Sequence, residues 1–329
     1  MGDLLQDLGA GLPKLVTAGM AVLIVIAILG VVFFIAGRLS GRAQGPVAGV
    51  IFLGPAVLLL IIGLVVPAIR TTTQSLQNNK GEFIGFENYG WVFTSEGQIQ
   101  VLVNTFLWII IVPLFSAGVG LTLALLLDRM RRESVPKSLI FMPMAISFVG
   151  AGIIFSLVYE YRDPSQPQVG LLSQIVMWLG VSDPPNWLLW TPWNNFLLMF
   201  IMVWIQVGFA MVVLSAAIKA IPQDVVEAAE LDGATGWRLF GKVTIPMIRT
   251  TLIVVVTTIM IATLKVFDIV RVMTNGNFGT QVVANEMYAQ AFVRFEYGRG
   301  SALAVILFVA VIPIIAYNIV QLRKERAIR

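Results

Sequence analysis

The sequence predicts an all-α polytopic membrane protein, and three observations support that fold class. Of the 329 residues, 58% are hydrophobic and 12% are charged, whereas a soluble domain averages about 25% charged residues. Several apolar runs exceed roughly 18 residues, the length that a helix needs to cross a bilayer. Lys and Arg are also shared unequally between alternate loops, as in membrane proteins with a fixed orientation. The chain is long enough for a single helical bundle.

Seven membrane spans are expected. The first, 15–36, is followed by the small and basic linker GRLSGRAQGP, so residues 1–46 are predicted to form an N-terminal accessory transmembrane helix with its linker. An uncleaved targeting and insertion anchor is an equally good interpretation of this helix. The remaining spans are predicted to form a six-helix core within 47–329, at residues 47–67, 101–127, 138–159, 194–219, 251–272 and 300–320.

The distribution of basic residues predicts the orientation of these spans. The loops that follow the first, third, fifth and seventh spans hold 14 of the 22 Lys and Arg residues. Because cytoplasmic loops carry the excess of Lys and Arg, these loops are expected on the cytoplasmic side. We therefore predict a multi-pass protein of the cytoplasmic (inner) membrane, with its N-terminus outside and its C-terminus and the 222–249 loop inside.

Composition also excludes several kinds of chemistry. The chain has no Cys and no His, which removes thiol chemistry, the usual general base and the commonest metal ligand. It has no GxxxxGK[ST] phosphate-binding loop. We therefore expect no catalytic residue, no metal site, no bound cofactor and no nucleic-acid partner for this chain, whose surroundings are the lipid bilayer.

The longest polar passage between two apolar runs, residues 222–249, is predicted to be a shaped surface outside the membrane. Pro222 ends the preceding helix, because proline lacks an N–H and clashes with the turn before it. A short helix with acidic residues in its first turn follows, and Gly233 then allows a sharp break at positive φ. A second short helix is expected to end at Pro246. Helix, tight turn and helix together favour a docking site for a partner.

Within this passage, EAAELDGATGWRLFGKVTIP resembles the EAA loop of permease subunits of binding-protein-dependent ABC importers. The family pattern is EAA, three residues, G, nine residues and I-x-L-P, and Val243 and Ile245 are conservative departures from it. Thr250 stands where many members have a second proline. In the family this loop is the coupling helix that sits in a cleft of the cytoplasmic ATPase. The resemblance implies ATPase coupling by Glu227, Ala228, Ala229, Asp232, Gly233 and Ala234.

Two further elements resemble carbohydrate permeases of that family. GFENY is similar to their GLxNY element, and the stretch from Phe267 is similar to FDxxYxxTxGGP followed by AFxxxxxGxxSA. Asn277 and Phe278 replace the usual Gly-Pro, and Arg271 stands near a customary tyrosine. The resemblance covers about residues 50–325. It implies the type I permease fold of ABC importers, of the maltose/α-glucoside type, with six core helices plus one.

The fifth span offers a candidate contact with a sugar. Gln206 lies between Trp204 and Phe209, where aromatic faces suit C–H surfaces and the amide suits hydroxyl groups. An interhelical hydrogen bond is the alternative role for this amide. Among the positions that contact sugar in maltose-type members, only Gln206, Phe209 and Thr263 keep suitable chemistry here. These three are the predicted substrate path.

Three ionisable residues near the end of the sixth span are spaced three apart. On one helix, Lys265, Asp268 and Arg271 would share a face. Ionisable residues within a span usually pair with one another or face a cavity. An ion-pair ladder and a polar lining of the translocation path are both open.

The resemblance predicts the transmembrane permease subunit of an ATP-driven carbohydrate importer, with an α-glucoside or related oligosaccharide as the preferred substrate. The implied partners are a second homologous permease, two copies of a cytoplasmic nucleotide-binding ATPase that use ATP and Mg²⁺, and an extracytoplasmic solute-binding protein. An ion-gradient-driven secondary transporter would need intramembrane carboxylates and internal repeats, of which only Asp268 is a candidate. An intramembrane enzyme is poorly supported without His or Cys.

Overall fold

The computed structural model describes residues 44–128, 130–163 and 165–326, with a few helical positions between 19 and 34. Contacts divide the chain into two units, residues 1–70 and 71–329. Most of the first predicted span lies outside the described residues. The predicted boundary between residues 46 and 47 falls within the first unit, and a separate accessory helix stays a prediction.

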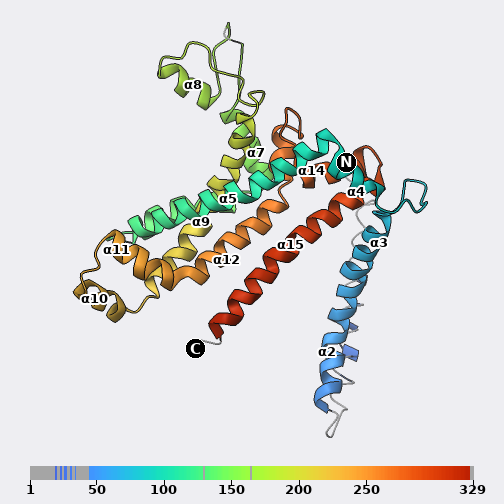
Figure 1. Cartoon of the computed structure of the whole chain (residues 1–329), viewed down its shortest axis with the longest axis horizontal. Coiled ribbons are helices and arrows are strands. Elements are labelled where there is room, and N and C mark those ends of the chain that lie inside the picture. Colours follow the sequence, from blue (N-terminus) through green and yellow to red (C-terminus); the bar gives the residue numbers. More distant parts are fainter. Residues whose placement is uncertain are drawn as a thin grey trace, which may run out of the picture. The chain divides into compact units, whose positions relative to one another are not determined.

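The described chain is built almost entirely of helices. One isolated bridge pairs Gln77 with Phe83, and no strand occurs in the described part. The elements, shown in Figure 1, are α2 (Gln44–Leu60), the π-helix η1 (Ile61–Val65), α3 (Val66–Gln74), α4 (Glu87–Thr94), α5 (Glu96–Leu127), α6 (Ser134–Phe141), the 3₁₀-helix η2 (Met142–Ala145), α7 (Phe148–Val158), α8 (Leu171–Trp178), α9 (Trp193–Lys219), α10 (Gln223–Leu231), α11 (Trp237–Leu239), the π-helix η3 (Phe240–Thr244), α12 (Ile245–Leu264), α13 (Asp268–Met273), α14 (Val283–Tyr288), the π-helix η4 (Ala289–Val293) and α15 (Tyr297–Arg326).

The all-α membrane fold is confirmed. Within the described residues, five helices are long and apolar enough to cross a membrane, and a bent pair brings the number to six if it counts as one span. The five helices are Phe52–Gln74, Glu96–Leu127, Trp193–Lys219, Trp237–Leu264 and Tyr297–Gln321. They overlap five of the six predicted core spans, although their ends differ from the predicted ones.

The predicted span 138–159 is not one straight helix. It forms two segments, Ser134–Ala145 and Phe148–Val158, that are bent by 101° at the break. The helix tightens to 3₁₀ geometry at Pro143, and Ser147 is extended with its hydroxyl accepting from the Gly150 N–H at 3.0 Å. Ser147 therefore caps α7, because an N-cap side chain satisfies an N–H of the first turn that has no helical partner.

The sixth predicted span is displaced toward the N-terminus. The helix is continuous from Trp237 through the π-helical turn η3 to Leu264, so the prediction that Pro246 ends a short helix is wrong. Pro246 follows the π-helical turn η3 after Ile245, so the regular α-helical bonding is already interrupted where the residue without an N–H stands. The helix ends because Lys265 and Val266 donate to carbonyls only three residues back, at 3.3 and 3.0 Å.

The core of the second unit forms around α9, which packs against α5, α6 and α12. Its largest fully buried side chains include Trp108, Met202 and Met211. At Gly120 of α5, an added Cβ would lie 2.6 Å from the Cβ of Ala210 and 2.8 Å from the Met211 nitrogen. The absence of a side chain at Gly120 is what allows α5 and α9 to approach so closely. Figure 1 shows the two helices side by side.

Candidate functional site

The predicted docking passage forms a short helix that is separate from the bundle core. Helix α10 begins at Gln223 after Pro222, and Asp224 lies in its first turn. None of its residues is buried. An exposed short helix gains little stability of its own from packing, so its shape must come from its ends. The connection back to α9 is short, since only Ala220, Ile221 and Pro222 separate the two helices.

The turn after α10 has the hydrogen bonds of a Schellman motif. Gly233 has φ +79° and donates to the Glu230 carbonyl at 3.0 Å, while the Ala234 N–H donates to the Ala229 carbonyl at 2.9 Å. This pair of bonds closes a helix through a residue in the left-handed region, where glycine has no steric penalty. The positive φ predicted at Gly233 is confirmed. The spacing from Ala229 to Gly233 is the spacing that this cap requires.

Two large apolar side chains flank the turn and face away from the protein. Leu231 is 90% exposed and Trp237 is 87% exposed. The Trp237 ring lies edge-on to Phe240, with centroids 5.8 Å apart. They are the two most exposed of the large apolar side chains in the described part of the chain.

The second arm of the passage is continuous with a candidate membrane helix. Trp237, η3 and α12 form one helix of 28 residues, and α12 packs against α5, α9 and α15. Val255 and Ile259 of α12 are buried in the core. A force applied at the docking passage would therefore reach the bundle through α12 on one side and through α9 on the other.

The predicted substrate-path residues lie inside the bundle. Gln206 is 8% exposed and makes no side-chain hydrogen bond in the described structure, so the alternative interhelical hydrogen bond is not formed. Phe209 is half-buried and packs against the core. Thr263 is fully buried, and its hydroxyl donates to the Ile259 carbonyl at 2.7 Å. Contact of these three residues with a substrate stays a prediction.

The three ionisable residues after α12 do not share one helical face. Lys265 caps α12, whereas Asp268 begins α13 and Arg271 lies in its last turn. No ion pair joins these three in the described structure, so an ion-pair ladder is wrong for this conformation. The Arg271 guanidinium instead lies over the Tyr288 ring, 4.9 Å from its centroid, and donates to Asn275. The helix break at residues 265–267 separates the charges.

Sequence reasoning missed a buried carboxylate in α14. Glu286 accepts hydrogen bonds from Gln290 at 2.6 Å, Arg294 at 2.8 Å, Gln281 at 2.6 Å and Gln98 of α5 at 3.2 Å. It borders a cavity of about 320 Å³ that Arg271 and Asn275 also line. The four-residue spacing of Glu286, Gln290 and Arg294 was a visible signal for this network. These contacts tie α14 and η4 to the start of α5.

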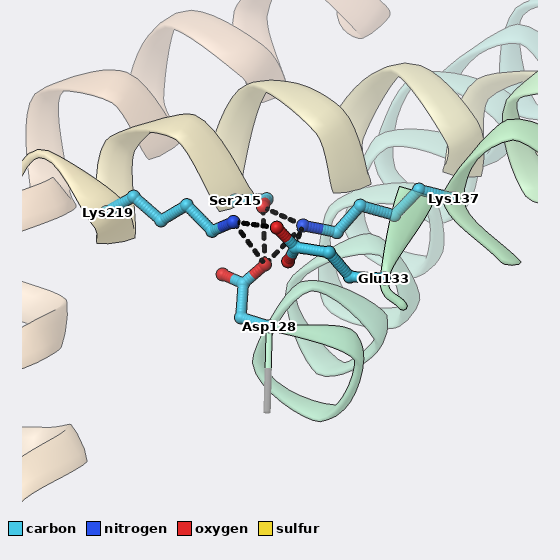
Figure 2. Close-up of polar contacts among 5 residues, drawn as sticks. All are labelled: Asp128, Glu133, Lys137, Ser215 and Lys219. Carbon is cyan, nitrogen blue, oxygen red and sulfur yellow. Dashed lines mark hydrogen bonds and ion pairs between the residues drawn. The ribbon is translucent and has the colours of Figure 1, made fainter. Parts of the chain in front are cut away.

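A second polar cluster was also missed, at the other end of α5. Figure 2 shows Asp128, Glu133, Lys137, Ser215 and Lys219 gathered around one point between α5, α6 and α9. Lys137 donates to Ser215 Oγ at 2.6 Å and to Glu133 at 2.9 Å. Sequence alone could not pair these residues, because Ser215 and Lys219 are distant from the others along the chain.

The sequence matches the family model described as binding-protein-dependent transport system inner membrane component over residues 116–329. It is 46% identical over 277 residues to the α-glucoside transport system permease protein AglF of Rhizobium meliloti, covering 84% of this chain and 82% of that protein. It is 45% identical over 279 residues to the osmoprotective compounds uptake permease protein GgtC of Synechocystis, covering 84% and 100%.

A more distant relative and one solved structure complete the comparison. The trehalose/maltose transport system permease protein MalF of Thermococcus litoralis is 30% identical over 287 residues, covering 84% of this chain and 93% of that protein. A chain of a bacterial alginate ABC transporter, solved in complex with an alginate-bound periplasmic protein, superposes with a TM-score of 0.70 at 22% identity. The superposition covers 81% of this chain and 91% of that one, and it supports the fold.

Proposed function

This chain belongs to the family of binding-protein-dependent transport system inner membrane components and is a permease subunit of an ABC importer, and we propose that it carries an α-glucoside or a related oligosaccharide. The likeness to AglF, at 46% identity over most of both chains, is the observation that carries the substrate class. The trehalose/maltose relative supports the same class. The ABC importer is favoured over the ion-driven secondary transporter that the sequence left open.

The docking passage is proposed to couple the chain to a cytoplasmic ATPase. Its capped helix α10 and the exposed Leu231 and Trp237 offer an apolar surface of defined shape. Glu227, Ala228, Ala229, Asp232, Gly233 and Ala234 lie on α10 and its turn. ATP and Mg²⁺ would be used by two copies of that ATPase, since the sequence of this chain has no GxxxxGK[ST] phosphate-binding loop.

The complex is proposed to contain a second homologous permease and an extracytoplasmic solute-binding protein that delivers the sugar. Closure of the ATPase pair would move α10, and the bundle would change from inward-open to outward-open, which is an alternating-access transition. Gln206, Phe209 and Thr263 are the proposed contacts along the path. Thr263 is fully buried in this conformation, so the transition would have to expose it before it could contact a substrate.

The test of the proposed function is uptake by the complete transporter in vesicles. The chain, its partner permease, the ATPase and the binding protein are reconstituted, and uptake of radiolabelled maltose, trehalose and sucrose is compared with that of the β-glucoside cellobiose. ATP-dependent uptake of an α-glucoside but not of cellobiose is expected. Uptake that ignores ATP and stops when an ionophore collapses the ion gradient would contradict the ABC mechanism. ATP-dependent uptake of cellobiose alone would contradict the substrate class.

The likeness to GgtC favours a second candidate substrate class, osmoprotective compounds. Small neutral compatible solutes are therefore included in the same uptake assay as competitors. If such a solute inhibits uptake of the labelled sugar more strongly than unlabelled maltose does, the substrate would be assigned to the osmoprotective compounds. The variant Gln206→Leu is expected to change the order of preference among the sugars, because the amide of Gln206 has no protein partner and is free to bind a sugar hydroxyl. An unchanged order would remove Gln206 from the proposed path.

The proposed orientation is testable because the chain has no cysteine. Lys80 and Arg132 are both exposed. Each is replaced by cysteine in a separate variant, and the variants are labelled in intact spheroplasts. A membrane-impermeant thiol reagent is expected to label Lys80→Cys directly and Arg132→Cys only after the membrane is permeabilised. The opposite pattern would invert the proposed sidedness.

A further inference from the structure

Five polar side chains join the ends of the membrane helices α5 and α9 to the start of α6, next to the docking passage (Figure 2). Asp128 follows α5, Glu133 and Lys137 stand at the start of α6, and Ser215 and Lys219 lie in the last turns of α9. Ser215 donates to Asp128 Oδ1 at 2.6 Å. Both lysines pair with both carboxylates: Lys137 with Asp128 and Glu133, and Lys219 with Glu133 and, at 4.0 Å, with Asp128.

We call Asp128, Glu133, Lys137, Ser215 and Lys219 the ion cluster. Its two positive and two negative charges balance, and its centre is shielded from water. The side chains of Lys137 and Asp128 are 15% and 13% exposed, whereas Lys219 is 48% exposed. Asp128 Oδ2 is buried and has no partner, so Asp128 depends on Oδ1 for its compensation. Removing one member of a shielded ion pair leaves an uncompensated charge, which is costly. Lys137 and Asp128 therefore hold α5 and α6 together, and Lys219 approaches them from the solvent side.

Lys219 also connects the ion cluster to the docking helix. It is the last residue of α9, and α10 begins at Gln223. The short connection is closed by backbone bonds, since Ile221 donates to the Ile218 carbonyl at 3.1 Å and Val225 donates to the Pro222 carbonyl at 3.2 Å. With so few residues and these bonds, α10 cannot move far without moving the last turn of α9. A displacement of that turn pulls on the Lys219–Glu133 pair.

We propose that the ion cluster transmits the movement of α10 to α5 and α6, with Lys219 as the positioning residue that links the docking helix to Glu133. This inference rests on the proposed function. Lys219 touches neither substrate nor nucleotide, and it acts through Glu133 and Asp128. Without it, the last turn of α9 could follow the ATPase while α5 and α6 stay in place. ATP hydrolysis would then continue, but each hydrolysed ATP would move less substrate.

The experiment measures substrate taken up per ATP hydrolysed by the complete reconstituted transporter, using whichever of maltose, trehalose or sucrose the wild type transports. Lys219→Met is expected to lower this ratio at least fivefold while the ATPase remains bound in a pull-down. Lys219→Arg keeps the charge and should stay close to wild type.

The matched control is Arg132→Met, which removes a basic residue beside Glu133 that is exposed and makes no ion pair in the described structure. It should leave the ratio unchanged. An unchanged ratio in Lys219→Met, or an equal loss in Lys219→Met and in Arg132→Met, would overturn the proposal. So would a loss of ATPase binding in Lys219→Met, which would make Lys219 part of the docking surface. Failure of the wild type to show ATP-dependent uptake would instead count against the proposed function.

Discussion

The Asn195 amide donates to the side-chain carbonyl of Asn104 at 3.0 Å, across the interface between α5 and α9. The same Asn195 accepts from the Trp108 indole at 2.8 Å, and Asn104 donates to the carbonyls of Gly279 and Gln281 at 2.7 and 2.9 Å. The two amides thus tie the beginnings of two membrane helices to the loop before α14. At the opposite ends of these helices the ion cluster makes a second polar tie.

Asn104→Leu is expected to destabilise the fold, because it leaves the buried Asn195 amide and two part-buried backbone carbonyls without their partners. Each buried unsatisfied group costs about 1–3 kcal/mol. The midpoint of thermal unfolding of the purified chain in nanodiscs should fall by several degrees. Asn277→Leu, at an exposed position whose side chain makes no hydrogen bond in the described structure, is the control. Equal midpoints for the two variants would contradict the role of this network.

A second prediction concerns the close approach of α5 and α9. Gly120→Val would place a side chain against Ala210 and the Met211 backbone. Overpacking of this kind costs about 1–3 kcal/mol. Gly118→Val is the matched control on the same helix, since an added Cβ there meets nothing within 4 Å. Unfolding in urea should show a loss for Gly120→Val well beyond that for Gly118→Val. Similar losses would mean that the cost comes from helix propensity alone.

The turn after α10 gives a prediction that separates backbone conformation from packing. Nothing lies within 4 Å of a Cβ added at Gly233, so a substitution there acts only through its φ of +79°. Gly233→Val should therefore abolish most ATP-driven uptake, while Gly233→Asn should keep more of it, because Asn tolerates the left-handed region. Membrane insertion should be normal in both.

Gly241→Val serves as the control for Gly233→Val. Its surroundings are equally open, and its φ is not positive. Uptake should be affected far less than in Gly233→Val. If Asn and Val at position 233 behave alike, the Schellman turn is not what the coupling needs.

The ion cluster predicts a particular response to acid. Hydrogen bonds from Lys137, and then from Lys219, lower the pKa of Glu133 from 4.5 to about 2. A carboxylate with a lowered folded-state pKa stabilises the fold above its ordinary pKa, and this contribution is lost as the pH falls from 4.5 toward 2. Glu133→Gln should therefore be less stable than the wild type at neutral pH, and the difference should shrink as the pH falls through that range.

The measurement is the thermal unfolding midpoint in nanodiscs between about pH 6 and about pH 3. Glu96→Gln, which removes an exposed carboxylate that makes no side-chain hydrogen bond or ion pair in the described structure, is the control. A constant difference between the wild type and Glu133→Gln over the whole range would refute the assigned pKa direction.

The helical fold and the docking turn could be predicted from the sequence because their causes are local. Long apolar runs require helices in a membrane, and Gly233 at its spacing from Ala229 requires a left-handed cap. The bend at Ser147 was missed because the surrounding run stays apolar, and only Pro143 and Ser147 mark it. The sixth span was misplaced because Pro246 was taken as a stop, whereas it lies in a first turn that follows a π-helix.

The polar clusters could not be predicted because their members come from distant parts of the chain. Glu286 meets Gln98, and Asp128 meets Ser215, only after α5 has packed beside α14 and α9. The opposite error occurred at Lys265, Asp268 and Arg271, where regular spacing implied a shared face. The backbone turns between the first and second of these residues, and regular spacing has no structural meaning across a helix break.

The exposure of Leu231 and Trp237 bears on how long this subunit survives in a cell that lacks its partners. Made in excess of its partners, the chain would leave two large apolar side chains uncovered beside a polar turn that is closed by backbone hydrogen bonds. Chaperones and membrane proteases recognise such uncovered patches. Balanced synthesis with a subunit that covers this surface should therefore raise the yield of the protein, and overproduction of the chain alone should lead to its turnover.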